Sequence, residues 1–154
     1  MRISLSADEL TGVAARLGEL LRERGHEVIL HGALLEGERP DWAWSAEAVA
    51  GDVAGGEADQ GVVCCWTGTG ACIAANKVPG VRAALCIDAP TAAGARRWND
   101  ANVLALSLRS TSEALLAEIL DAWFEVQPSA DPGDRANVDH LAEIEQLERE
   151  LPPG

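Results

Sequence analysis

The residues best suited to chemistry lie between Ala58 and Asp88, where a cysteine comes directly before a turn of small residues. Gln60 to Cys65 is a short apolar run of the kind that forms a buried parallel strand. It is followed by Trp66-Thr67-Gly68-Thr69-Gly70, and we expect a helix from Ala71 to Asn76. Backbone N–H groups at the start of a helix lack partners within it, so they can bind a phosphate, a carboxylate or a developing oxyanion.

This pattern predicts that Cys65 acts as a base or nucleophile beside oxyanion donors. The positive end of a helix dipole favours a thiolate over a thiol, which makes a nearby cysteine a better proton acceptor. The alternative is that Cys65 is a small buried strand residue, as free cysteines usually are. Cys64 must point to the opposite face of the strand and is predicted to be a core residue, as are Cys72 and Cys86.

Composition argues against several other functions. The chain has 154 residues, of which 47% are hydrophobic, and suits one compact domain. Its formal charge of −13 disfavours binding to nucleic acids or to anionic membranes. The sequence shows neither a membrane span nor a secretion signal, and we expect a cytoplasmic protein. The cysteines form no CxxC pair, so we predict neither a disulfide framework nor a metal site, and we expect no cofactor.

Segments with strand character alternate with segments of helical periodicity along the chain. The predicted strands are Arg2 to Ser6, His26 to Leu30, Gln60 to Cys65, Val81 to Cys86 and Asn102 to Leu106. The predicted helices run from about Leu10 to Leu21, Trp42 to Ala54, Ala71 to Asn76, Pro90 to Trp98 and Ser110 to Phe124. Ser110 and Glu113 have the spacing of a capping box at the start of the last helix.

This alternation predicts an α/β fold with a five-stranded parallel sheet covered by helices on both faces. Ligands of such sheets bind beyond the carboxyl ends of the strands, where Asp8 and Cys65 are expected. A break at Pro128 to Gly133 separates a domain of residues 1–126 from a tail of residues 127–154. The tail is predicted to contain an extra C-terminal helix from Arg135 to Leu151. Its narrow apolar stripe leaves two alternatives open, docking on the chain's own body or on a partner subunit.

Three runs of the sequence together resemble a known family. They are Cys65 to Gly70 (CWTGTG), Ile73 to Cys86 (IAANKVPGVRAALC) and Asn99 to Leu104 (NDANVL). They are similar to the sugar-phosphate isomerases that include ribose-5-phosphate isomerase type B and the galactose-6-phosphate isomerase subunits. The resemblance implies a Rossmann-like three-layer α/β/α sandwich and metal-free interconversion of an aldose and a ketose. It also implies a homodimer, or a dimer of dimers, with active sites at the subunit interface.

The resemblance further implies roles for individual residues. Cys65 would remove the proton next to the carbonyl of a carbohydrate or related carbonyl substrate. The loop from Thr67 to Gly70 would stabilise the enediolate through its backbone N–H groups. The residues that would bind the substrate are Asp8, Trp42, Trp66, Gly68, Thr69, Gly70, Trp98, Asn99 and Arg135. From the residues alone, Asp8 has an alternative role as a cap of the first helix.

Several family residues are replaced in this chain. Glu9 and Trp98 stand where the family has histidines, one of which opens the sugar ring, and Trp66 stands where the family has a glycine. The family's C-terminal segment is rich in arginine and histidine, whereas Ser129 to the end of this chain holds two arginines against seven acidic residues. A phosphate dianion is usually met by several cationic donors, so we expect a substrate other than ribose 5-phosphate.

The aromatic composition is unusual, with five Trp, one Phe and no Tyr. One interpretation is packing or anchoring of a dimer interface. The other is an aromatic cage in which Trp42, Trp66 and Trp98, all predicted at strand ends, replace the missing imidazoles. Glu9 is either a replacement acid or base, or simply a charge in the first helical turn. His31 and His140 are expected on the surface. A second hypothesis for the chain is a non-catalytic binding or scaffold protein whose former pocket is filled by tryptophans.

Overall fold

The computed structural model describes the backbone of residues 1–150 and the side chains through residue 147. Five parallel strands form one sheet in the order β2-β1-β3-β5-β4, which confirms the predicted five-stranded parallel sheet. The strands are β1 (Arg2–Ala7), β2 (Glu27–Gly32), β3 (Gln60–Cys65), β4 (Ala83–Leu85) and β5 (Val103–Ser107). The helices are α1 (Ala14–Glu23), α2 (Trp42–Gly55), α3 (Thr69–Ala75), α4 (Ala89–Asn99), α5 (Glu113–Glu125) and α6 (Pro132–Glu150).

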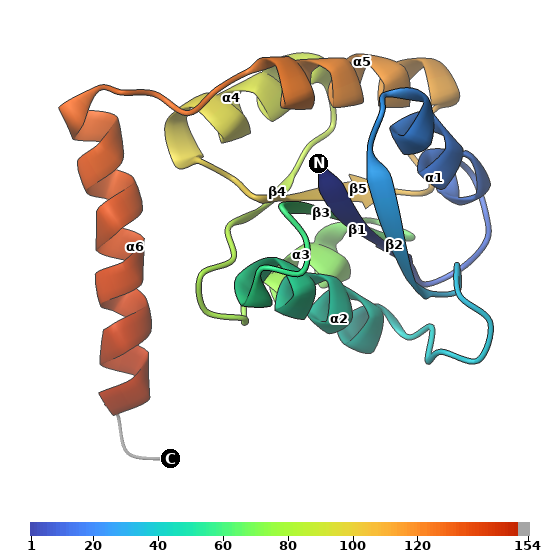
Figure 1. Ribbon diagram of the computed structural model, residues 1–154, viewed down its shortest axis with the longest axis horizontal. Helices are drawn as coiled ribbons and strands as arrows, with labels where there is room; N and C mark the ends of the chain where they lie inside the picture. Colours follow the sequence, from blue (N-terminus) through green and yellow to red (C-terminus); the bar gives the residue numbers. More distant parts are fainter. Residues whose placement is uncertain (151–154) are drawn as a thin grey trace.

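Helices cover both faces of the sheet and give the predicted three layers (Figure 1). α1, α4 and α5 pack on one face, and α2 and α3 pack on the other. The helix between β1 and β2 therefore crosses one face, while the helix between β3 and β4 crosses the opposite face. Strands covered in this way are buried on both sides, which explains their apolar sequences.

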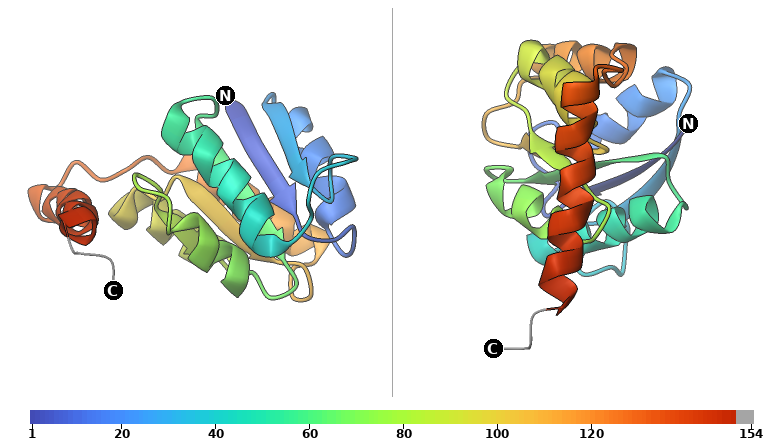
Figure 2. Two further views of the ribbon diagram at one scale, coloured as in Figure 1. Left: turned by 90° about the horizontal axis from the view of Figure 1, so that it is seen from below. Right: turned by 90° about the vertical axis from the view of Figure 1, so that its left-hand side faces the viewer.

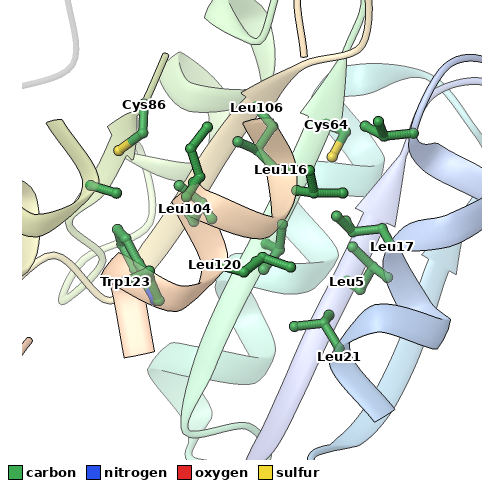
Figure 3. Close-up of a cluster of buried hydrophobic side chains, with 14 of the residues drawn as sticks. Leu5, Leu17, Leu21, Cys64, Cys86, Leu104, Leu106, Leu116, Leu120 and Trp123 are labelled. Carbon is green, nitrogen blue, oxygen red and sulfur yellow. The ribbon is translucent and has the colours of Figure 1, made fainter. Parts of the chain in front are cut away.

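Each face of the sheet has its own apolar core. On the α1 side, leucines from β1, β5, α1 and α5 pack with Trp123, and Figure 3 shows Cys64 among them. The indole N–H of Trp123 donates to Gln60 Oε1 at 2.7 Å, so burial leaves no polar group of this ring unpaired. The core on the α2 side consists mainly of alanine and valine, because α2 and α3 are rich in small residues.

The first helix begins later than its apolar periodicity predicted. α1 begins at Ala14 rather than near Leu10, and Val13 at its N-cap makes no side-chain cap. The chain turns at Gly12, which has a φ of 56° and lies so close to the Leu108 carbonyl that a Cβ would approach its oxygen to 2.6 Å. This contact fixes the loop after β1 against the loop after β5.

Boundaries near the end of the chain also differ from those predicted. The cap of α5 is Ser112, whose hydroxyl accepts a hydrogen bond from the Leu115 N–H at 3.1 Å, so the expected capping box of Ser110 and Glu113 does not form. β4 has three residues, Ala83–Leu85, where a strand from Val81 to Cys86 was expected. α6 begins at Pro132 rather than Arg135. Its predicted end at Leu151 lies outside the described residues.

The last helix, α6, stands beside the three layers instead of joining one of them (Figures 1 and 2). An extended segment of residues 126–131 leads from α5 to α6. One tie to the body is the Gly80 N–H, which donates to Glu145 Oε1 at 2.9 Å. Leu141, Ile144 and Leu147 remain exposed by 41%, 42% and 60%. The chain's own body therefore leaves much of the predicted apolar stripe uncovered.

Within residues 1–150, none of the helices combines the length and the apolar character needed to cross a membrane. Over the described side chains, no group of three or more His, Cys, Asp or Glu is arranged to hold a metal ion.

Candidate active site

The topology has a switch point at the carboxyl ends of β1 and β3, and we call the space above these strand ends the crevice. These neighbouring strands send their connections to opposite sides, β1 to β2 and β3 to β4, and the connections cross opposite faces of the sheet. A switch of this kind opens a space above the strand ends, where open α/β sheets bind ligands. Asp8 and Cys65 lie at the two strand ends that border the crevice. The predicted site residues Asp8 and Cys65 therefore remain a candidate site at the switch point.

Cys65 points to the α2 side of the sheet, and Cys64 points to the α1 side, as strand alternation predicted. Cys65 is 4% exposed and packs in the small-residue core that includes Ala46 and Ala71. Its carbonyl accepts from Leu108 N–H at 3.0 Å, which ties the end of β3 to the segment after β5. The Cys65 side chain is thus buried at the carboxyl end of β3.

The other three thiols have environments that oppose ionisation. Burial raises the pKa of Cys64 far above the ordinary thiol value, and it raises the pKa of Cys86 to about 12. Burial is also the main cause of the raised pKa of Cys72, whose Sγ lies 3.5 Å from the Ala83 carbonyl oxygen. These three residues are core or helix-packing residues, as predicted.

The turn after Cys65 positions the first turn of α3 over the strand ends. Gly68 has a φ of 78° and its N–H donates to the Cys65 carbonyl at 3.2 Å, so this amide is already paired and is not available to an oxyanion. The N–H groups of Thr69 and Gly70 begin α3 and have no backbone partner among residues 1–150. The Thr67 and Thr69 hydroxyls lie 2.8 Å apart and are exposed.

Two predicted aromatic residues flank this turn. The ring of Trp42, the first residue of α2, lies so close to Gly70 that a Cβ there would be 3.0 Å from the ring. Trp66 follows Cys65 directly and is 51% exposed. Its carbonyl accepts from the Ser107 hydroxyl at 3.0 Å and from Arg109 N–H at 3.1 Å, which fixes its backbone. The Trp42 ring therefore packs against the start of α3, beside the turn that follows Cys65.

Asp8 directly follows β1 and lies beside the end of β3, which carries Cys65. Its N–H donates to the Cys64 carbonyl at 3.3 Å, which extends the pairing of Ala7 with Cys64 by one residue. Asp8 is thus one residue past β1, and Cys65 is the last residue of the neighbouring strand β3. Because α1 begins only at Ala14, the alternative that Asp8 caps the first helix is wrong.

Asp8 is half-buried, and one oxygen of its carboxyl, Oδ1, is buried without a hydrogen-bond partner among the described residues. Burial raises the pKa of Asp8, and the neighbouring charge of Glu9 raises it further, while backbone N–H groups including that of Trp66 lower it. A buried, unpaired acceptor is costly, so this oxygen is suited to receive a hydroxyl from a bound molecule.

The remaining predicted residues lie at the other edge of the sheet. Trp98 and Asn99 end α4, which runs back from the carboxyl end of β4 to the segment before Val103. Trp98 was predicted to lie at a strand end, but it lies at the end of a helix. Val103 is four residues from Ser107, the neighbour of Cys65, so the two edges are separated by about 13 Å.

Trp98 and Arg135 line a common cavity of about 270 Å³ between the end of α4 and the start of α6. The charged residues of its lining are Arg97, Asp100, Asp134, Arg135 and Asp139. Asn99 lines an adjoining cavity of about 370 Å³ beneath α6. Trp98 and Asn99 also line a third cavity, of about 590 Å³, together with Leu85 of β4, whose side chain lies beside Gly68. Asp8, Trp42 and Cys65 to Gly70 belong to the strand ends and the turn, and Trp98, Asn99 and Arg135 come from α4 and α6.

One group of interacting residues was missed in the sequence. His31 was expected on the surface, but its side chain is 15% exposed and both ring nitrogens contact carboxylates, those of Glu38 and Asp52. His140 is exposed, as predicted, and pairs with Glu143 at 2.6 Å. The sequence carried no signal for the His31 cluster, because its members are 7 and 21 residues apart and meet only through the fold.

Comparison with known proteins supports the resemblance and the fold. A family model described as Ribose/Galactose Isomerase matches residues 3–141. Ribose-5-phosphate isomerase B of Escherichia coli strain K12 is 46% identical over 107 residues, covering 70% of this chain and 71% of the relative. D-erythrulose-4-phosphate isomerase of Pectobacterium atrosepticum is 34% identical over 128 residues, covering 82% and 84%. A solved structure of Clostridium thermocellum ribose-5-phosphate isomerase B is 36% identical, with a TM-score of 0.87 and coverage of 96% of this chain and 99% of that one.

Proposed function

The chain belongs to the ribose/galactose isomerase family, and we propose that it interconverts an aldose and a ketose with Cys65 as the base. The thiolate of Cys65 takes the proton from the carbon next to the carbonyl, and the C–H electron pair becomes the C=C bond of an enediolate. The proton then returns to the former carbonyl carbon, while the hydroxyl proton moves between the two oxygens. No external oxidant or reductant is needed.

The observation that carries this proposal is the placement of Asp8 and Cys65 at the adjacent carboxyl ends of β1 and β3, at the topological switch point. The N–H groups of Thr69 and Gly70 supply oxyanion donors at the start of α3, and that of Thr67 adds to them. The unpaired Oδ1 of Asp8 accepts a substrate hydroxyl. Trp42 stacks against the carbon skeleton from the side of α2.

The second half of the site comes from a second copy of the chain in this proposal. Trp98 and Asn99 come from the end of α4 and Arg135 from α6, whereas Cys65 ends β3, so these residues belong to a different part of the same protomer. The uncovered apolar stripe of α6 supports a homodimer, because Leu141, Ile144 and Leu147 remain exposed in one chain. The C-terminal tail, residues 127–154, then docks on the partner subunit.

The charges of both halves favour a substrate with little negative charge. Asp8 and Glu9 border the first half, and the cavity of the second half carries two arginines against three aspartates. A phosphate dianion would lack a clear excess of cationic donors in either half. With Glu9 and Trp98 in place of ring-opening histidines, we expect open-chain or short sugars to be preferred. Tetroses and pentoses, each with and without phosphate, test this point. The highest kcat/KM for ribose 5-phosphate would refute it.

Paired cysteine variants test the base. Cys65→Ser is expected to lower kcat by at least about a hundredfold on the best sugar of that panel, because proton abstraction loses its acceptor. Cys64→Ala is the matched control, since Cys64 is the adjacent residue in the opposite core and should leave kcat near the wild-type value. Thermal unfolding of both variants separates loss of chemistry from loss of fold. Unchanged turnover in Cys65→Ser would rule out its role.

The burial of Cys65 favours one second candidate, a binding protein built on the isomerase fold. A thiol that is 4% exposed meets small molecules only if the crevice opens to them. Alkylation of the native protein, followed by identification of the modified cysteine, distinguishes the two functions. Reaction at Cys65 that a sugar slows supports the isomerase. An inert Cys65 in a protein without isomerase activity supports the binding protein.

A further inference from the structure

His31 lies between two carboxylates that belong to different elements. Its Nδ1 is 3.1 Å from both carboxylate oxygens of Glu38, in the loop between β2 and α2. Its Nε2 is 2.8 Å from Asp52 Oδ2, which comes from the third turn of α2. The side chains of His31, Glu38 and Asp52 are 15%, 35% and 22% exposed, so solvent screens these contacts only in part. The three residues form a clasp, which we name the His31 clasp.

Two further hydrogen bonds extend the His31 clasp to the sheet. The Ser4 hydroxyl donates to the same Asp52 oxygen at 2.7 Å, and the Gly32 N–H donates to Glu38 Oε2 at 2.9 Å. The clasp therefore joins β1, β2, α2 and the loop of residues 33–41. These are the elements that surround the crevice on the side of Trp42.

The clasp is complete only when the imidazole carries two protons. Ionised carboxylates accept hydrogen bonds and cannot donate them, so each ring nitrogen must supply its own N–H. Either neutral tautomer would leave one carboxylate facing a nitrogen lone pair. The charged groups that face the ring are Glu38 from the loop and Asp52 from α2, while β1 contributes the neutral Ser4.

The loop held by the clasp leads directly into Trp42. Glu38 is four residues before Trp42, and the segment between them is tied at its end by Arg39, which pairs with Asp41 at 2.7 Å and lies 3.5 Å over the Trp44 ring. Trp42 in turn lies against Gly70, at the start of α3. A displacement of Glu38 would therefore shift Trp42, because only four residues of chain, held by the Arg39 contacts, connect the two.

We propose that His31 is a positioning residue whose clasp holds the loop of residues 33–41, and with it Trp42, over the turn beside Cys65. Loss of the clasp, by removal of the Glu38 charge, releases both the loop and Trp42. The structural part of this inference stands on the contacts alone. Its consequence for turnover rests on the proposed isomerase function.

Hydrogen–deuterium exchange tests the structural part in the intact protein. Glu38→Gln keeps the size of the side chain but removes the charge, and it is expected to speed exchange about tenfold in peptides covering residues 33–44 and 67–72. Glu36→Gln is the matched control, because Glu36 lies in the same loop, is exposed and makes no ion pair among the described residues.

The outcomes separate positioning from local stabilisation. Faster exchange in residues 33–44 alone, or equal effects of Glu38→Gln and Glu36→Gln, would overturn the inference. With an active sugar, Glu38→Gln should raise KM severalfold more than it lowers kcat, whereas a simple loss of folded protein would lower only the apparent kcat. If the wild type turns over no sugar, the proposed function fails, but the exchange experiment still decides whether the clasp positions Trp42.

Discussion

At the scale of single residues, the turn after Cys65 requires glycine at one position. Gly68 has a φ of 78°, a conformation that side chains other than glycine rarely adopt. An added Cβ would lie 2.6 Å from Leu85 Cδ1 and 2.8 Å from the carbonyl carbon of Leu106. Leu85 and Leu106 belong to β4 and β5, so the sheet itself would have to shift to make room.

Gly68→Ala is therefore expected to lower the free energy of unfolding by roughly 2–4 kcal/mol, because it combines backbone strain with overpacking. Gly51→Ala is the control, since Gly51 lies within α2 with nothing near its missing Cβ and should gain about 0.5–1 kcal/mol from helix propensity. Urea unfolding of both variants measures the difference. Equal stabilities would contradict the account of the turn.

Residue environments divide into those that local patterns predict and those that only the fold creates. The opposite directions of Cys64 and Cys65 follow from strand alternation, and the structure confirms them. The burial of Asp8 and the contacts of His31 depend on chain segments up to several tens of residues away. No periodicity or spacing in the sequence encodes such contacts.

At the scale of elements, two asparagines in the runs that resemble the family form hydrogen bonds that hold β4 and the segment before it. Asn76 forms a two-way pair with Ala83, donating to its carbonyl at 2.9 Å and accepting from its N–H at 2.8 Å, so it occupies the outer edge of β4. Asn102 Oδ1 accepts from Arg82 N–H at 2.7 Å, and its amide donates to the Gly80 carbonyl at 2.9 Å. The runs that carry the family resemblance therefore specify the β4 edge as well as the crevice.

The contact between the α1–β2 junction and α5 should depend on pH. The ring centroid of His26 lies 4.4 Å from that of Phe124, and its Nδ1 is buried without a hydrogen-bond partner among the described residues. Burial lowers the pKa of His26 below the ordinary value of 6.5, and the N-terminal amine and Arg24 lower it further. The folded state therefore favours the neutral ring.

The sign of the effect follows from this lowered pKa. Above about pH 6.5 the ring is neutral in both states, and as the pH falls below this value the unfolded state gains the proton first, so stability declines. His26→Phe should reduce the decline of unfolding free energy between about pH 6.5 and 5, measured by urea unfolding at each pH. His140→Gln, on the exposed face of α6, is the control and should keep the wild-type slope. A wild-type slope in His26→Phe would disprove this origin.

At the scale of the whole molecule, the strand order was not predicted, although the parallel three-layer sheet was. Alternating strand and helix patterns determine the layers, because each crossover must cover one face of the sheet. The separation of the candidate site into two parts arises from the direction of α4, which carries Trp98 and Asn99 away from Cys65. Motif order along the chain contains no information about this distance.

A site completed by a second copy predicts complementation between two inactive variants. Cys65→Ser damages the first half and Asn99→Ala the second, so each homodimer should be nearly inactive. When the two variants are co-expressed, half of the dimers are mixed and each has one intact site, so the mixture should regain about a quarter and the purified mixed dimers about half of the wild-type kcat. The chain that carries both substitutions, co-expressed with the wild type, is the control for subunit exchange. Tandem affinity purification isolates the mixed dimers. If they remain inactive while size-exclusion chromatography shows dimers, the two halves do not form one site across the interface.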